Sequence, residues 1–413
     1  MQMGEKKRIR VAIFGHFDGS NFGNECTLQA FLHHLRCYRP DAQITCISSG
    51  PEATVANHQI EAIPISENLF KSWRPRHPLL RLVRTVFVGI PSELYRLIDG
   101  LRRLWRTDVL IFPGTGLLSD AWNLTGWGPY NQFKWSLMAK ICRCKLLFVS
   151  VGAGPLYGTL GRWFVKSALS LADFRSYRDN STIQHLKSIG FRADNDPVYP
   201  DLVFSLPVAI TPDQDTERCQ RTIVGLGLMA YAGPYSIPTP DNAIYLTYLE
   251  NLASLAKWLL AQENDVRLLI GGIADVPTTK DFMGLLRKRF PVFDERHIID
   301  EPVTSVKDLL SQIAATDIVV ATRFHNVLLA LLYEKPVISI SFHHKCASLM
   351  SAMGLSAYCL DINDFKADQL IEKICDVKIN ATKLKYLIRE KNEEFRKALD
   401  QQYKLIFHDT LRG

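Results

Sequence analysis

The sequence lacks both the cysteine pattern of a disulfide scaffold and the long apolar run of a membrane-spanning helix. Its nine cysteines are scattered over 413 residues, and only Cys142 and Cys144 lie close together. Because no second pair has that spacing, we expect reduced thiols in a cytosolic protein. The longest uncharged run, residues 222–240, is broken by glycine and proline and predicts a buried strand and a loop. The first ten residues contain no apolar signal core, so we do not expect secretion.

A strong excess of one charge is also absent. The chain has 49 Lys and Arg against 42 Asp and Glu, a net charge of +7. This excess is too small and too dispersed to indicate a nucleic-acid-binding protein, although it suits a small anionic substrate. The apolar content of 47% is that of a globular protein, and the length predicts two domains.

Two series of apolar, strand-like runs alternate with helical patterns along the chain. The first series covers residues 11–14, 44–47, 109–112, 146–151 and 174–177, and the second covers 223–228, 266–270, 297–299, 318–320 and 337–340. This alternation predicts parallel sheets built from βαβ units. We therefore predict an α/β fold with two Rossmann-like domains facing a cleft. The predicted boundaries are 1–206 for the N-terminal domain, 207–382 for the C-terminal domain and 383–413 for a helix that packs back on the body.

Glycine-rich turns follow three predicted strands of the first series. Since the carboxyl ends of parallel strands meet at one sheet edge, these turns would bring backbone close to a ligand there. The candidate acceptor or cleft residues are Gly19, Asn21, Glu25, Gly114, Gly116, Gly152 and Gly154. The turn at residues 15–25 does not have the G-x-G-x-x-G spacing, so it does not indicate a dinucleotide. The alternative there is a plain turn capped by Asn, with Glu25 favouring the helix dipole instead of orienting a sugar hydroxyl.

Basic residues follow strands in both series. Arg178 comes after the run 174–177 and could grip a carboxylate or phosphate with two N–H groups, or it could pair with Asp179 in a helix-capping turn. Arg323 and His325 come after the run 318–320, at the start of a helical pattern, where anions are favoured.

One more cation and one imidazole complete the candidate donor site. Lys345 follows the next predicted strand and would face the same edge. His325 titrates near neutrality and could exchange a proton with a bound substrate, whereas the alternative is a structural histidine. The spacing of histidines and cysteines matches no metal site, so we predict none.

The segment 71–106 carries nine Lys and Arg, with Trp73 and Trp105 near its ends. A basic, apolar, Trp-bearing helix can lie on an anionic membrane. The other interpretation is a solvated helical excursion that covers a sheet edge, and this is the one that the sequence favours.

Taken in order, these blocks resemble the polysaccharide pyruvyl transferase family over roughly residues 9–360. The matching blocks are 15–25, 108–120, 149–155, 176–190, 200–201 and 321–345. The resemblance implies a GT-B-like fold with the acceptor on the N-terminal side and the donor on the C-terminal side. It implies transfer of the enolpyruvyl group of phosphoenolpyruvate to a sugar, usually as a cyclic pyruvate ketal. Arg178 and His325 match donor-binding residues of the family and are our candidate catalytic residues. Phe324 matches a donor-pocket position and Lys345 a basic position, and Arg323 would add charge to the same site.

Three features depart from the family pattern. Asn24 stands where an acid is common, Pro113 and Thr115 interrupt a glycine run, and Phe342 replaces a tyrosine. They motivate one alternative, a non-catalytic sugar-binding family member. A second alternative is a GT-B nucleotide-sugar glycosyltransferase, which would share the two-domain cleft. We predict no required cofactor and no nucleic-acid partner. The expected acceptor is a free, nucleotide-linked or lipid-linked saccharide of exopolysaccharide or cell-envelope biosynthesis. The expected location is the cytoplasm, at the inner face of the membrane if the acceptor is lipid-linked.

Overall fold

The computed structural model describes residues 8–67, 77, 84–120, 127–208, 221–231 and 242–410, and the chain divides into two compact units. The first unit comprises Met1–Gly19, Phe31–Asp201 and Gln402–Gly413, and the second comprises Ser20–Ala30 and Leu202–Gln401. Two of the boundaries fall inside helices, α1 (Phe22–Tyr38) and α14 (Ala381–Lys404). Each unit therefore contains a short segment that a single cut at residue 206 would assign to the other.

The first unit is built on a six-stranded parallel sheet of order β3-β2-β1-β4-β5-β6. Its strands are β1 (Arg10–Gly15), β2 (Gln43–Ser48), β3 (Glu61–Pro64), β4 (Val109–Pro113), β5 (Lys145–Val151) and β6 (Phe174–Tyr177). The five predicted strands are confirmed, while β3 at the edge was not predicted. Stacked rings of Phe112 and Phe148, with centroids 4.4 Å apart, pack the centre of the sheet.

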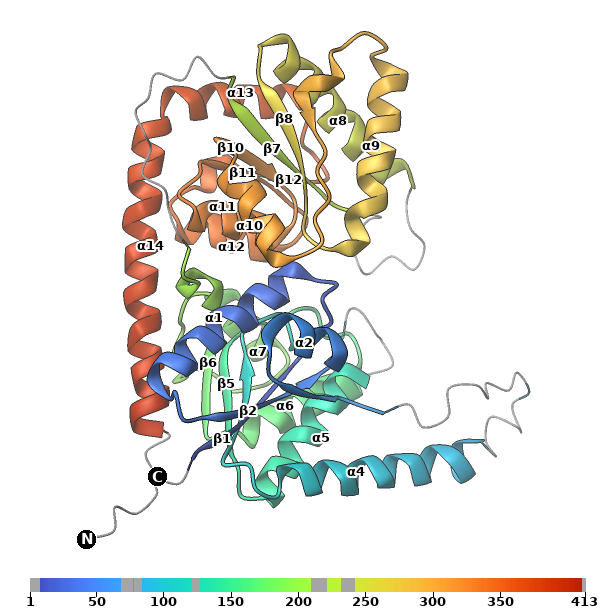
Figure 1. Cartoon of the computed structure of the whole chain (residues 1–413), viewed down its shortest axis with the longest axis vertical. Helices are drawn as coiled ribbons and strands as arrows, with labels where there is room; N and C mark the ends of the chain where they lie inside the picture. The colour runs from blue at the N-terminus through green and yellow to red at the C-terminus, as the bar shows by residue number, and fades with distance from the viewer. Residues whose placement is uncertain are drawn as a thin grey trace. The chain divides into compact units, whose positions relative to one another are not determined.

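Helices of the first unit are α1, α2 (Pro51–His58), α4 (Ile90–Leu104), α5 (Trp127–Ile141), α6 (Thr159–Ser170) and α7 (Asn180–Ser188). In the basic segment predicted at 71–106, a π-helical turn at Thr85–Gly89 leads into α4. Four basic residues of this segment and Trp73 lie outside the described residues. The four are Lys71, Arg74, Arg76 and Arg81. Figure 1 shows each sheet surrounded by helices of its own unit.

The second unit repeats this plan with a parallel sheet of order β12-β11-β10-β7-β8-β9. Its strands are β7 (Ile223–Leu228), β8 (Asp265–Ile270), β9 (Ile298–Ile299), β10 (Ile318–Ala321), β11 (Val337–Ser341) and β12 (Cys359–Asp361). Its helices are α8 (Asn242–Ala261), α9 (Val276–Arg289), α10 (Val306–Ala314), α11 (Phe324–Leu332), α12 (His344–Ala352), α13 (Ala367–Ile379) and most of α14. The five predicted strands are again confirmed, and β12 is the edge strand that was missed.

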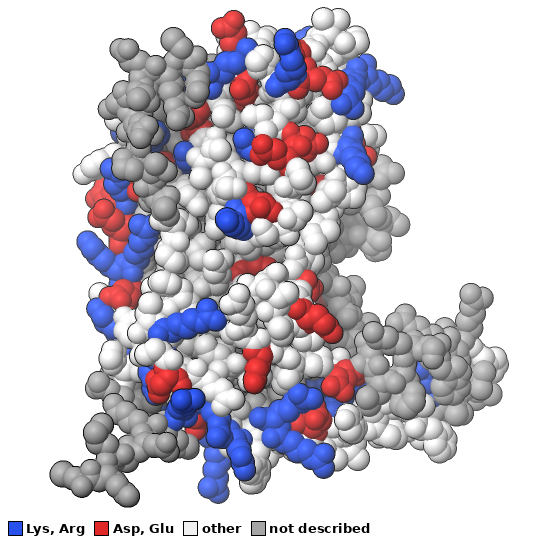
Figure 2. Space-filling view, in the orientation of Figure 1, with Lys and Arg blue, Asp and Glu red and all other residues white. Residues whose placement is uncertain are grey.

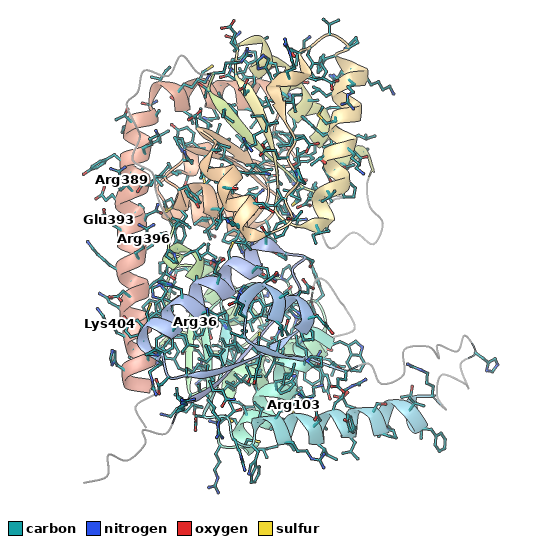
Figure 3. All side chains as sticks on the ribbon, in the orientation of Figure 1. Arg36, Arg103, Arg389, Glu393, Arg396 and Lys404 are labelled. Atoms are coloured by element: carbon teal, nitrogen blue, oxygen red, sulfur yellow. The ribbon has the colours of Figure 1, made fainter. Side chains whose placement is uncertain are left out.

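Helix α14 covers much of the segment 383–413 in which a helix was predicted, and Figure 3 labels its Arg389, Glu393, Arg396 and Lys404. In the second unit, Asn392 donates a 2.7 Å hydrogen bond to the carbonyl of Leu331. In the first unit, buried Gln402 donates to Ser176 Oγ at 2.6 Å and accepts from Ser150 Oγ at 3.0 Å. The C-terminal segment is thus part of the packed interior rather than an appendage.

Among the described helices, none has the length and hydropathy needed to cross a bilayer. The cysteines that the structure describes are all free thiols.

Candidate functional site

The glycine-rich turns of the first unit lie along the carboxyl edge of its sheet. After β4, Gly114 and Thr115 have φ values of +50° and +57°, the left-handed region that glycine adopts easily and threonine rarely. The Gly114 N–H donates to Val149 at 2.7 Å, and the Gly152 N–H donates to Thr115 at 2.8 Å. The β4 turn, with half-buried Gly116, is therefore tied to the β5 turn, which also contains buried Gly154.

Arg178 lies directly against one of these turns. A Cβ atom on Gly152 would be 2.4 Å from the Arg178 Nε, so no side chain fits at position 152 without moving the guanidinium. Arg178 is buried, and its Nη1 donates to Asp201 at 3.1 Å, while Nε lies 3.4 Å from Asp179. The two carboxylates hold the guanidinium plane in one orientation.

Asp179 is the N-cap of α7, accepting a 2.6 Å hydrogen bond from the Thr182 N–H. Burial acts to raise the pKa of Asp179, but Arg178 and the hydrogen bonds from Ser181 and Thr182 outweigh it and hold the pKa below its ordinary value. The Arg–Asp pair in a capping turn, one of the two interpretations offered for Arg178, is present. The pairing with Asp201 was not predicted, because Asp201 follows 23 residues later with no motif linking the two.

In the second unit, Arg323 follows β10 and is the N-cap residue of α11. Its Nε and Nη2 donate to the two carboxylate oxygens of Asp275, at 2.8 and 2.6 Å. Asp275 is fully buried and also accepts from the N–H groups of Ala230 and Gly271, at 3.0 and 3.3 Å. Arg323, predicted as a cation of the donor site, therefore pairs with the buried carboxylate of Asp275. Through Asp275 it is linked to the turns after β7 and β8, which hold Ala230 and Gly271.

His325, in the first turn of α11, packs against the backbone of α1. A Cβ atom on Gly23 would lie 1.9 Å from the His325 Nδ1. The Phe324 ring stands edge-on to the His325 ring, with centroids 5.2 Å apart. The imidazole is half-buried and held between an aromatic ring and a glycine. The His325 ring can occupy this position only because residue 23 is a glycine, which has no side chain.

The segment that carries Gly23 is fastened to the turn after β8. Asn21 caps α1 by accepting from the Gly23 N–H at 3.1 Å and forms a β-bridge with Gly272. The Ile273 N–H donates to the carbonyl of Ser20 at 3.0 Å. Glu25, in the first turn of α1, is buried in the same unit as His325.

A second helix start lies beside that of α11, because β10 and β11 are paired in parallel. His343 caps α12, and its Nδ1 accepts from the Lys345 N–H at 3.4 Å. The rings of His343 and His344 are 3.9 Å apart, and Lys345 is half-buried in the first turn. Imidazoles and cations thus follow two adjacent strands.

The predicted residues divide between the units. Gly19, Gly114, Gly116, Gly152, Gly154 and Arg178 are in the first, whereas Asn21, Glu25, Arg323, Phe324, His325 and Lys345 are in the second. Most of these residues follow strands of their own unit's sheet, whereas Asn21 and Glu25 follow β1 of the first sheet and belong to the second unit. Within the described residues, no three His, Cys, Asp or Glu side chains gather as they would around a metal ion.

Comparisons with known proteins bear on the family and the fold of the chain. A family model described as polysaccharide pyruvyl transferase matches residues 21–344. No curated protein matches the chain. Among solved structures, the chain is similar to Anabaena HepE in complex with UDP and glucose. The two chains are 13% identical and superimpose with a TM-score of 0.58, and the match covers 97% of this chain and 100% of the HepE chain.

Two further solved structures share the fold. The UDP-GlcNAc 2-epimerase from Neisseria meningitidis bound to UDP-GlcNAc has 12% identity, a TM-score of 0.59 and coverage of 98% and 100%. A glycosyltransferase from Rickettsia africae has 13% identity, a TM-score of 0.57 and coverage of 98% and 100%. At such low identity the likeness concerns the fold alone, and it confirms the predicted GT-B-like α/β class.

Proposed function

Because this chain belongs to the polysaccharide pyruvyl transferase family, we propose that it transfers the enolpyruvyl group of phosphoenolpyruvate to a saccharide and closes a pyruvate ketal. The observation that supports this best is the pair of helix starts after β10 and β11. They bring His325, His343 and Lys345 to one edge of one sheet.

Phosphoenolpyruvate carries a carboxylate and a phosphate on one small carbon skeleton. Helix N-termini attract such anions through their backbone N–H groups. Lys345 adds a cation at α12, and we assign it to the phosphate that leaves. Arg323 contributes by holding the start of α11 through Asp275, and Phe324 by bordering the imidazole.

His325 is the candidate proton donor. Proton transfer to the methylene carbon of phosphoenolpyruvate makes it a methyl group and leaves an oxocarbenium-like centre at the neighbouring carbon. A sugar hydroxyl adds to that centre and gives up its proton. The carbon–oxygen bond to phosphate then breaks, and a second hydroxyl adds to close the ketal. One hydroxyl proton restores the acid and the other leaves with the phosphate, so the step is balanced without a redox partner.

In the first unit, we assign Arg178 to an anionic group of a substrate, carboxylate or phosphate, and Asp201 and Asp179 to its orientation. The glycine turns around Gly114 and Gly152 are assigned to the saccharide, which can approach bare backbone there. HepE and the Neisseria epimerase were solved with UDP or a UDP-sugar, which makes a nucleotide-linked sugar one acceptor to test. The reaction as proposed needs no cofactor.

The test is phosphate release from phosphoenolpyruvate against a panel of free, nucleotide-linked and lipid-linked sugars. We expect release that depends on the acceptor, with the mass of a pyruvate ketal added to the sugar. His325→Ala should lower turnover by about a hundredfold or more if this imidazole transfers the proton. His33→Ala, an exposed histidine of α1, is the control and should leave the rate unchanged. Thermal protection by a nucleotide sugar, with none by phosphoenolpyruvate and no phosphate release, would instead favour a glycosyltransferase. Sugar binding without turnover would indicate a binding protein.

A further inference from the structure

Within the part of the chain that the structure describes, helix α4 carries a stripe of exposed apolar side chains. Phe87, Ile90, Leu94, Ile98 and Trp105 recur at helical spacing along one side of the helix and the turn before it. Their exposed fractions range from 42% for Ile98 to 74% for Phe87. Large apolar side chains gathered in this way mark a surface that binds something.

The inner side of the same helix is already occupied. A Cβ atom on Gly100 would lie 2.7 Å from the Met138 side chain of α5, so the two helices are in close contact. Glu93 accepts hydrogen bonds from Tyr130 and Lys134 of α5, at 2.8 and 3.0 Å. The inner side of α4 is therefore packed on α5, and the stripe lies on a different side of the helix.

The neighbouring helices carry further exposed apolar side chains. Helix α5 packs between α4 and α6. Ile141 of α5 is 57% exposed, and Leu160 and Trp163 of α6 are 66% and 52% exposed. Exposed tryptophan is typical of the boundary between water and lipid, because its ring is apolar and its N–H needs a polar partner.

A basic cavity adjoins the C-terminal end of α4. Its volume is about 580 Å³, and Trp105 and Arg106 line it. The other basic residues that line it are Arg8, Arg10, Arg39, Arg143 and Lys145, against one acidic residue, Asp108. Figure 2 shows Lys and Arg gathered at the lower end of this unit, and Figure 3 labels Arg103 on α4 nearby. Trp105 thus belongs to both the apolar stripe and the basic cavity.

We propose that the outer face of α4, with Trp105 and the adjoining basic cavity, binds the surface of an anionic phospholipid membrane. Apolar side chains would enter the interface while the arginines meet lipid phosphates. The basic side chains beside the stripe favour an anionic surface over a second copy of the chain, which would add a further set of positive charges to the contact. The sequence favoured a solvated excursion here, and the exposed stripe reverses that preference. This inference is independent of the reaction proposed above.

The test is co-sedimentation of the full chain with vesicles of phosphatidylcholine alone or with 30% phosphatidylglycerol, a composition chosen to be moderately anionic. We expect binding to the anionic vesicles that weakens as salt is raised, because the charges are exposed. Leu94→Glu together with Ile98→Glu should lower the partition coefficient about tenfold or more. Leu246→Glu in α8 of the second unit, 49% exposed, is the matched control and should bind like the unchanged protein.

A second pair of variants tests the charge. Arg102→Gln and Arg106→Gln should each lower binding to anionic vesicles about fivefold and leave binding to phosphatidylcholine unchanged. Failure of the folded protein to bind, or equal binding to both vesicles, would overturn the proposal. So would a dimer in sedimentation velocity that Leu94→Glu turns into a monomer, because the face would then belong to a second copy.

Discussion

The imidazole of His325 lies so close to the backbone of Gly23 that a Cβ atom there would be 1.9 Å from its Nδ1. Gly23→Ala must therefore turn the His325 ring away. We expect a fall in turnover that approaches that of His325→Ala, about a hundredfold or more, while the protein stays folded. Steady-state phosphate release together with a circular dichroism melt would measure both effects.

Gly284→Ala is the control for that change, because a Cβ atom on Gly284 would meet nothing within 4 Å. This glycine is inside α9, where alanine favours the helix by about 0.5–1 kcal/mol. The melting temperature should rise slightly and the rate should not change. Unchanged turnover in both variants would show that the contact between Gly23 and His325 is not needed for catalysis.

Loss of the Asp275 charge should destabilise the second unit. Asp275→Ala leaves the Arg323 guanidinium and two backbone N–H groups without their acceptor, and breaking a buried pair in this way costs about 3–5 kcal/mol. Chemical denaturation measures the loss. Asp294→Ala, which breaks an exposed pair with Arg296, should leave the denaturation midpoint unchanged and serves as the comparison.

The depressed pKa of Asp179 predicts how stability depends on pH. A carboxylate whose pKa is lower in the folded than in the unfolded chain contributes stability above its unfolded pKa of about 3.9, and this contribution is lost as pH falls through the folded pKa. Asp179→Asn keeps a side chain that can cap α7 but removes the charge. The variant should be less stable than the unchanged protein at pH 7, and the difference should shrink below about pH 4. Melting curves across that range would show it, and a difference that does not vary with pH would contradict it.

Gln402→Leu should cost about 1–3 kcal/mol, because Ser150 and Ser176 would lose a hydrogen-bond partner inside the first unit. Its neighbour Gln401 is exposed, so Gln401→Leu is the natural control. Equilibrium unfolding in urea distinguishes the two. Equal midpoints would show that the buried amide makes no net contribution.

The sequence predicted the central strands well because each is a nearly continuous apolar run, as buried parallel strands are. The edge strands β3 and β12 escaped prediction because each short, partly buried run includes a charged residue, Glu61 or Asp361, whereas the edge strand β9 is an uninterrupted Ile–Ile pair. Their side chains carry too weak a pattern to separate them from loops.

Strand-end reasoning predicted that Arg178, Arg323 and Lys345 follow strands, and in the structure they follow β6, β10 and β11. It could not find Asp275, which is separated from Arg323 by 48 residues and lies in a short turn without a motif. Nor could it foresee that Gly23 and His325 would touch, since only the folded second unit brings the start of α1 to α11. The apolar residues of α4 recur at helical spacing in the sequence. The sequence does not show which side of that helix is exposed, because exposure depends on how the helix packs.

The division of the chain bears on how it folds as it is made. The first unit includes Gln402–Gly413, whose Tyr403 and Phe407 are buried with Phe31 of α1. Those residues follow the whole of the second unit in the chain, so the first unit cannot complete its interior until the second has been synthesised. Until then the surface that Tyr403 and Phe407 will cover is exposed to water, and a nascent chain that stalls within the second unit keeps that apolar surface of the first unit exposed.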